Sequence, residues 1–212
     1  MANLQFKKDH NKVAFLGKAK GHEVYDPMVD FLKRSKIHFA LTYSPNVIYE
    51  SLVKQFWASA TKRSETEIVA TIDGAEYVVT ESLIRTQLRL DDEGGVYHTN
   101  TEEILTGLRD VGYQSTATDM WHKNKFCPMW RFMVHTLLQC ISNKSGGWDQ
   151  FSTQLGCGIV CLSKGLTYNF SKFIFDNMIE NIQKKKHKFL MYPRFLQIIL
   201  GIITQERVFC PI

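Results

Sequence analysis

The chain has 212 residues, of which 44% are hydrophobic and 22% are charged. This is the composition of an ordinary globular protein, and it excludes disorder over most of the length. The net charge of +5 permits anionic partners without requiring them, whereas a dedicated nucleic-acid domain usually carries a stronger and more clustered excess.

The cysteines and the N-terminal residues indicate the compartment. Five cysteines are present, an odd number, and the first residues lack the apolar core of a signal peptide, which together argue against a disulfide framework. We therefore expect an intracellular protein, either cytoplasmic or nuclear. The most apolar stretch, FLQIILGII at residues 195–203, is far shorter than the roughly 20 residues of a membrane span. We expect a buried core helix there and no membrane span.

The N-terminal third is predicted to contain two helices. Residues 1–22 form a polar, basic N-terminal segment. Helical spacing of apolar residues then predicts an amphipathic helix over residues 23–34. A stronger helix is predicted within residues 42–60, with Ser44 as the N-cap and Pro45 at the first helical position. Its predicted apolar stripe contains Val47, Ile48, Leu52, Val53, Phe56 and Trp57.

Residues 67–79, EIVATIDGAEYVV, predict a small antiparallel β-hairpin. Asp73 and Gly74 are the favoured pair for a two-residue type I′ turn. With this turn, the predicted apolar cross-strand pairs are Ile72 with Ala75, Ala70 with Tyr77 and Ile68 with Val79. A lone hairpin is marginal in water, so we expect its apolar face to pack on a neighbouring helix or a further strand.

Six further helices are predicted after the hairpin from apolar periodicity, capping residues and prolines. They are expected after the cap residue Thr80, over residues 101–112, 128–142 and 148–165, from about Phe170 to a basic end, and over residues 192–206. Residues 113–127 read as irregular, and we place a soft joint at residues 112–126. Neither half shows a complete core of its own. We therefore expect residues 23–212 to form a single, mainly α-helical domain with one small antiparallel β-hairpin.

No catalytic signature is present: G-x-S-x-G, the P-loop, G-x-G-x-x-G and H-E-x-x-H are all missing from the sequence. The tightest cysteine pair, Cys157 and Cys161, would share one face of a helix, with His135 and Cys140 on the preceding helix. This spacing departs from structural zinc patterns, and free cysteine packs as a small hydrophobic residue. We expect core packing, with no metal and no cofactor. A pocket near these four residues, in an enzyme or a small-molecule-binding protein, is the alternative.

The sharpest run of charge is KKKHK, which consists of Lys184, Lys185, Lys186, His187 and Lys188. The run falls where a helix is expected to end, and cations there complement the helix dipole. We favour a solvated helix end. Contact with phosphate groups or with a nuclear-import receptor is the functional alternative.

Five segments occur in a characteristic order. They are SLVKQFWASA, ATIDGAEYVVTESLIRTQLRL, CPMWRFMVHTLLQCI, GIVCLSKGLTYNFSKFIFDNMIENI and FLMYPRFLQIIL. In order and spacing, over about residues 30–205, the chain resembles the plant transposon-protein domain of retroelement polyproteins, in particular retrotransposon-derived proteins abundant in daisy-family plants. The resemblance implies no catalytic residues and a role in assembly or interaction. We expect a non-enzymatic, retroelement-derived interaction module that binds protein partners, itself or nucleic acid.

Overall fold

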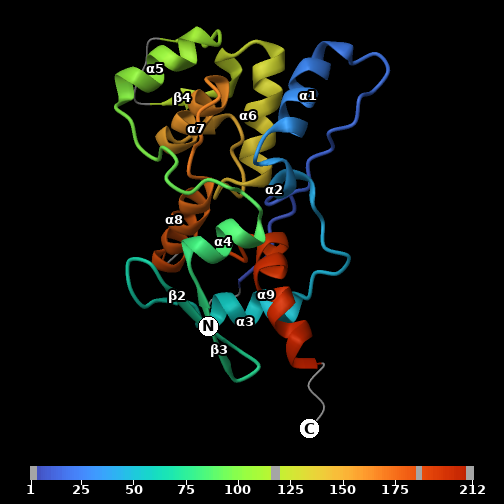
Figure 1. The fold of residues 1–212 in the computed structure, drawn as a ribbon, viewed down its shortest axis with the longest axis vertical. Coiled ribbons are helices and arrows are strands. Elements are labelled where there is room, and N and C mark those ends of the chain that lie inside the picture. The colour runs from blue at the N-terminus through green and yellow to red at the C-terminus, as the bar shows by residue number, and fades with distance from the viewer. Residues whose placement is uncertain (1–3, 116–119, 185–187, 209–212) are drawn as a thin grey trace.

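A computed structural model of the chain describes residues 4–115, 120–184 and 188–208, with side chains as far as residue 201. The fold is mainly α-helical, as predicted (Figure 1). The helices are η1 (Glu23–Tyr25), α1 (Asp26–Arg34), α2 (His38–Thr42), α3 (Glu50–Ser59), α4 (Glu81–Gln87), α5 (Thr101–Asp110), η2 (Lys123–Lys125), α6 (Pro128–Cys140), α7 (Thr153–Ser163), α8 (Phe170–Gln183) and α9 (Pro193–Val208). The strands are β1 (Thr61–Lys62), β2 (Ile68–Ile72), β3 (Ala75–Val79), β4 (Trp121–His122) and β5 (Gln150–Phe151).

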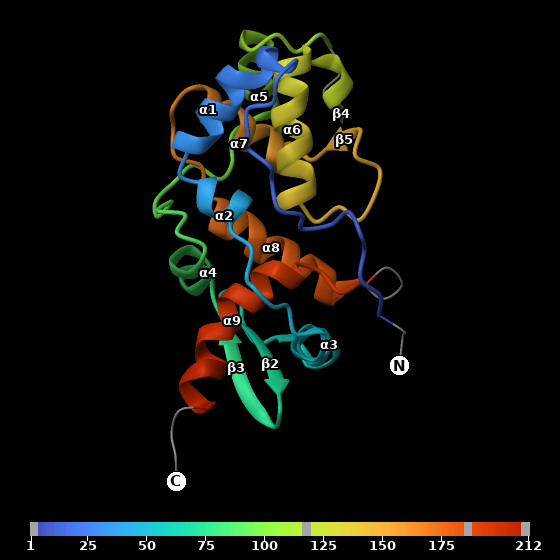
Figure 2. The ribbon, with the colours of Figure 1, turned by 90° about the vertical axis from the view of Figure 1, so that its right-hand side faces the viewer.

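The molecule is elongated, and its elements gather at two ends. Helices α1, α5, α6 and α7 lie at one end, α3, α9 and the β2–β3 hairpin lie at the other, and α2, α4 and α8 lie between them (Figures 1 and 2). A single hydrophobic cluster contains Leu137 of α6, Ile174 of α8 and Phe56 of α3. Among the described residues, the two ends therefore share one continuous core.

The predicted hairpin is present in the predicted register. Ile68 pairs with Val79, Ala70 with Tyr77 and Ile72 with Ala75. Asp73 and Gly74 have φ angles of 49° and 77°, as a type I′ turn requires at both central positions. The short strand β1 pairs with β2 and extends the hairpin to a three-stranded sheet. The sequence did not predict this strand or the small β4–β5 pair.

Helix α3 covers the sheet, as the apolar face of the hairpin required. Phe56 and Trp57 on α3 belong to the same buried cluster as Ile68. The Oγ atom of Ser59 accepts a hydrogen bond from the backbone N–H of Thr71 at 2.8 Å, and it also lies 3.0 Å from the carbonyl oxygen of that residue. These polar contacts fix the helix along β2.

The prediction that this helix begins at Ser44 and Pro45 is wrong, because α3 begins at Glu50. Residues 43–49 instead run beside α9 without regular structure (Figure 2). Asparagine, β-branched and aromatic residues, which favour helix only weakly, fill positions 46–49. Val47 and Ile48, which the prediction placed on the apolar stripe of this helix, are exposed.

The N-terminal segment contributes buried polar groups to the core. His10 and Asn11 are 4% exposed. The side-chain amide of Asn11 donates a hydrogen bond to the carbonyl oxygen of Cys140 at 2.8 Å and accepts one from the backbone N–H of Arg194 at 3.0 Å. Residues 10–11 thus join the end of α6 to the start of α9, although the sequence of residues 1–22 is polar and basic.

The sequence predicts helix caps at Ser44, at Thr80, at Asn100 or Thr101, and at Ser171, and two of these four are present. Thr80 accepts a hydrogen bond from the backbone N–H of Leu83, and Asn100 caps α5. The cap of α8 is Asn169 rather than Ser171, whose backbone N–H donates to the buried carboxylate of Asp92 at 2.7 Å. A carboxylate from outside the helix therefore satisfies one of the free N–H groups at its start.

Helix α9 contains the most apolar stretch of the chain. Phe195, Leu196, Ile199 and Leu200 are completely buried, which confirms the predicted core helix. Within the described ranges, no helix combines the length and the apolar character needed to cross a bilayer.

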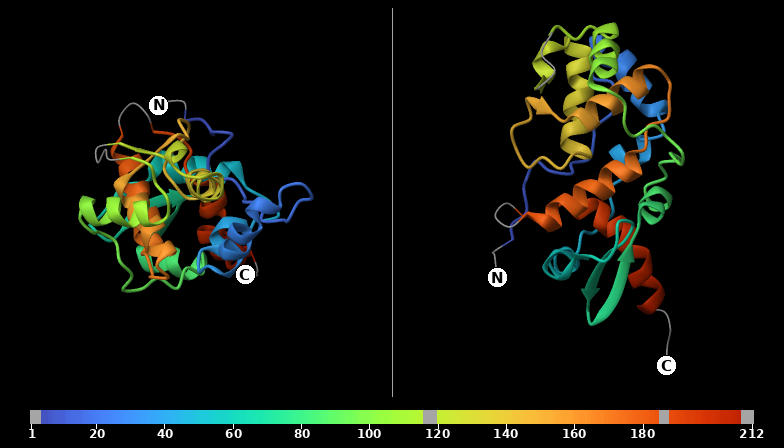
Figure 3. Two further views of the ribbon diagram at one scale, coloured as in Figure 1. Left: turned by 90° about the horizontal axis from the view of Figure 1, so that it is seen from above. Right: turned by 90° about the vertical axis from the view of Figure 1, so that its left-hand side faces the viewer.

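The region of the predicted soft joint is flanked by packed aromatic residues. Residues 116–119 lie outside the described part of the chain. On either side, the ring of Tyr113 lies 4.8 Å from that of Phe126 and 6.0 Å from that of Trp121. All three rings contact Phe151, so the described flanks belong to the end that contains α6 and α7 (Figure 3).

Candidate functional site

The basic run near the end of α8 is described only in part. The ammonium of Lys184 lies 2.7 Å from Oε1 of Glu180, and that of Lys188 lies 5.9 Å from the centre of the Trp57 ring. Burial lowers the pKa of Lys188. The other three predicted site residues, Lys185, Lys186 and His187, lie outside the described residues. The two described lysines make intramolecular contacts, and the role in phosphate or import recognition stays a prediction.

His135 and Cys140, on α6, have different surroundings. Nδ1 of His135 lies 2.9 Å from the ammonium of Lys123, and burial together with this cation lowers the pKa of the imidazole. Cys140 is 2% exposed, and burial raises the pKa of its thiol to about 11. A thiol with a raised pKa is a poor nucleophile at neutral pH, because the thiolate is the reactive form.

Cys157 and Cys161 lie buried on one face of α7, as predicted. A hydrogen bond between the two thiols raises the pKa of Cys157 and lowers that of Cys161. Around them the helix packs closely: a Cβ atom at Gly156 would lie 3.2 Å from Ile104 of α5. Across the described ranges, no three His, Cys, Asp or Glu side chains form a group that could hold a metal ion.

A groove away from these cysteines lies at the side of α9. Its volume is about 470 Å³, within the range of ligand-binding clefts. The walls are formed by four parts of the chain: α2, the α2–α3 connection, the end of α4 with the residues after it, and α9. They are Phe39, Tyr43, Pro45, Asn46, Val47, Tyr49, Thr86, Gln87, Arg89, Gln197, Ile198 and Gly201. We call this hollow the groove, and we call residues 43–49 the strap.

The strap exposes an unusual amount of apolar surface. Tyr43 is 44% exposed, Val47 52%, Ile48 39% and Tyr49 57%. Single exposed apolar residues are normal on protein surfaces, but a contiguous group marks a surface that binds something. Three of these four side chains, those of Tyr43, Val47 and Tyr49, line the same groove and form such a group.

Two hydrogen bonds hold the strap against α9. Nη1 of the buried Arg194 donates to the carbonyl oxygen of Tyr43 at 2.8 Å. Near the other end of the strap, the backbone N–H of Tyr49 donates to Oε1 of Gln197 at 3.0 Å. Between these two anchors, the backbone N–H groups of residues 46–48 have no hydrogen-bond partner in the described part of the chain. The middle of the strap therefore presents free backbone donors beside an apolar surface.

Among the described lining residues, Arg89 is the one that carries a charge. The guanidinium of Arg89 lies 4.5 Å from the centre of the Phe39 ring, and Phe39 stacks on Tyr43 with 4.6 Å between ring centres. No Asp or Glu occurs among the lining residues that the structure describes. The resulting surface is aromatic and weakly positive.

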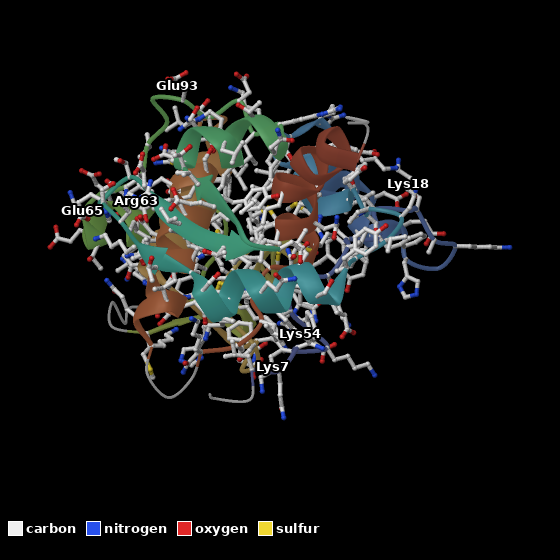
Figure 4. The ribbon with its side chains drawn as sticks, turned by 90° about the horizontal axis from the view of Figure 1, so that it is seen from below. Lys7, Lys18, Lys54, Arg63, Glu65 and Glu93 are labelled. Atoms are coloured by element: carbon white, nitrogen blue, oxygen red, sulfur yellow. The ribbon has the colours of Figure 1, made fainter. Side chains whose placement is uncertain are left out.

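A second hollow of about 550 Å³ differs from the groove because most of its charges are paired. Its acidic residues are Glu65, Glu67, Glu81 and Glu93, and its cations are Arg85 and Lys172. Arg85 pairs with Glu81, Lys172 pairs with Asp176 at 3.0 Å, and Glu65 lies 2.5 Å from Lys62. Figure 4 shows Glu65 and Glu93 along one edge of this end of the molecule. We assign no ligand to this hollow.

Comparison of the chain with protein-family models, with curated proteins and with solved structures gives no match. The site is therefore defined by its own geometry. Sequence reasoning missed the groove because it placed the strap on a helix. The available signal was the run Asn46-Val47-Ile48-Tyr49, whose residue types favour extended backbone.

Proposed function

We propose that the chain is a non-enzymatic interaction module of retroelement origin that binds a segment of a partner protein in the groove. The observation that carries this proposal is the strap, which exposes Tyr43, Val47, Ile48 and Tyr49 together. Aromatic side chains that are rigidly placed and exposed are the typical anchors of protein interfaces. The order of the five sequence segments supports the retroelement origin.

A protein partner fits the groove better than nucleic acid does. Proteins that bind single strands combine aromatic platforms with a row of cations along the backbone. The part of the lining that the structure describes has three aromatic rings but only one cation, Arg89. A segment of mixed apolar and polar side chains therefore matches the surface more closely than a polyanion.

The experiment is selection from a displayed library of random 12-residue peptides on the intact protein. The selected peptides are then labelled with fluorescein, and their affinity is measured by fluorescence anisotropy. Tyr49→Ser should weaken binding about 10-fold or more, as expected for the loss of a buried aromatic anchor. Phe15→Ser is the matched control, because Phe15 is 82% exposed and lies outside the groove lining.

Three results would overturn the proposal. The first is that no peptide binds above the background, and the second is that Tyr49→Ser and Phe15→Ser weaken binding equally. The third is that another ligand occupies the groove. Concentration-dependent mass in light scattering that Tyr49→Ser abolishes would identify a second copy of the chain. Binding of single-stranded RNA that Tyr49→Ser abolishes and that falls steeply with salt would identify nucleic acid.

A further inference from the structure

Arg89 is held in a fixed position at the mouth of the groove. It follows the last turn of α4 with φ at 53°, so the chain turns there and directs the side chain across α2. The guanidinium lies over Phe39, 4.5 Å from the ring centre. A planar guanidinium on an aromatic face keeps the N–H groups at its edge free to donate, and its orientation is set before any ligand arrives.

The positive charge of Arg89 is not neutralised within the described part of the chain. Some arginines have acidic partners, since Arg63 pairs with Glu76 at 2.5 Å and Arg85 pairs with Asp92 at 2.8 Å. Arg89 differs from the other described arginines because it combines a free charge with a place in the groove lining and a stacked position on Phe39. Within the described ranges, Arg89 makes no ion pair and no carboxylate lines the groove. A ligand can therefore supply the missing anion.

The size of the charge favours a carboxylate. Phosphate groups on proteins carry about two negative charges and are recognised by clusters of arginines. Arg89 is the single cation among the described lining residues, and one guanidinium pairs with one carboxylate through two parallel hydrogen bonds. The charge of the site thus matches an Asp or Glu side chain.

The rest of the groove suits an extended backbone. In strand addition, N–H groups at alternate positions of an edge donate to the added chain, and the N–H groups of residues 46–48 have no partner in the described part of the chain. A chain that runs alongside the strap can therefore accept hydrogen bonds from those N–H groups that face it. The side-chain amides of Asn46 and Gln87 line the same groove and offer both donors and acceptors. Tyr43, Val47 and Tyr49 supply apolar contact for alternate side chains.

We infer that the occupant is an extended peptide segment with one acidic side chain beside aromatic, aliphatic or prolyl residues. Arg89 is the residue that determines this specificity by receiving the carboxylate. This inference rests on the proposed function of the groove, and it names the chemical class of the partner segment.

The test uses the same displayed peptide library, selected separately on the wild-type protein and on Arg89→Glu. Peptides selected on the wild type should be enriched in one Asp or Glu at a fixed distance from apolar residues. Their affinity should fall at least 10-fold in Arg89→Gln and further in Arg89→Glu. Arg89→Lys should recover only part of the loss, because an ammonium lacks the two-pronged geometry.

Selection on Arg89→Glu should instead enrich Lys or Arg at the same distance. Arg131→Glu is the control with an equal change in charge, since Arg131 is exposed on α6 and lies outside the groove lining. The affinity of this control variant for the selected peptides should stay within about twofold of the wild-type value. Thermal unfolding of each variant establishes that it is folded, and Arg89→Gln keeps the test valid if the reversed charge disturbs the fold.

The two proposals fail in different ways. Peptides can bind with an affinity that Tyr49→Ser lowers, while Arg89→Glu changes neither the affinity nor the selected sequences. In that case the groove is an interaction site and the carboxylate inference is wrong. Selected peptides without an acidic residue would also overturn the inference. If no peptide depends on Tyr49, both proposals are overturned.

Discussion

Nη1 of the buried Arg194 donates a hydrogen bond to the carbonyl oxygen of Tyr43 at 2.8 Å. Nε and Nη2 of the same side chain reach the carbonyl oxygens of Asn11 and Lys12, each at 3.2 Å. One guanidinium thus joins the N-terminal segment, the strap and the start of α9. It lies almost completely buried and meets backbone carbonyl groups rather than a carboxylate, and burial lowers its pKa to about 10.

Replacing this guanidinium should loosen the strap. Arg194→Lys keeps the charge but cannot reach three carbonyl groups in different directions, so buried acceptors lose their donors. We expect the free energy of unfolding in urea to fall by about 2–3 kcal/mol. The exposed Arg131→Lys should change it by less than about 0.5 kcal/mol. Equal stability of the two variants would show that the three hydrogen bonds do not hold the strap.

His10 should make the stability depend on pH. Its Nε2 accepts a hydrogen bond from the backbone N–H of Tyr192 at 3.0 Å, and Nδ1 lies 2.8 Å from the carbonyl oxygen of Lys144. Burial, with a smaller effect of the Arg194 charge, lowers the pKa of this histidine from 6.5 to about 4. The folded protein therefore binds fewer protons than the unfolded chain between these values.

The contribution of His10 is fully present above pH 6.5 and is lost as the pH falls towards 4. As the pH falls from 6.5 to 4, protons bind to His10 in the unfolded chain before they bind in the folded protein. We expect this difference to lower the free energy of unfolding by about 3 kcal/mol. Urea unfolding at pH 7 and at pH 4.5 measures the change in the wild type and in His10→Gln. The variant should be less stable at pH 7 and should lose less stability on acidification. The same pH dependence in both proteins would contradict the assignment to His10.

The turn of the hairpin offers a test confined to the backbone. A Cβ atom at Gly74 would meet no atom within 4 Å, but the φ of 77° is unfavourable for any other residue. Gly74→Ala should therefore cost about 1–2 kcal/mol of stability. Gly146→Ala, at an equally open site without positive φ, should be nearly neutral. If both substitutions had the same effect in urea unfolding, the turn would not be of type I′.

Thiol labelling tests the alternative site around the cysteines. Cys127 is exposed, whereas Cys140, Cys157 and Cys161 are buried. In a Cys210→Ser background, N-ethylmaleimide at neutral pH should modify Cys127 at least 10-fold faster than the other three, because reaction needs an accessible thiolate. Peptide mapping by mass spectrometry gives the rates. Fast and selective modification of one buried cysteine would instead favour a reactive thiol site.

The hairpin was predictable from the sequence because its determinants are local. The pair Asp73-Gly74 specifies the turn, and strict alternation of side chains specifies the register. The capping residues Thr80 and Asn100 were predictable for the same reason, since each acts on an N–H group three residues away. In all these cases the interacting groups lie within a few residues of each other.

The groove was not predictable because its determinants are distant in sequence. Ser44 and Pro45 are a good local start for a helix, but hydrogen bonds from Arg194 and to Gln197, about 150 residues later, hold the strap in another conformation. The same is true of the stacking between Arg89 and Phe39. Residue types alone do not reveal that two such groups will meet.

The most direct test of the groove is a two-dimensional ¹H–¹⁵N NMR titration of the intact protein with a peptide selected from the library. Binding in the groove predicts that the largest shifts fall on residues 39–49, 86–89 and 197–201, and that Tyr49→Ser removes them. Shifts concentrated instead around residues 135–161 or near Lys184 and Lys188, with residues 39–49 unchanged, would contradict the proposed function.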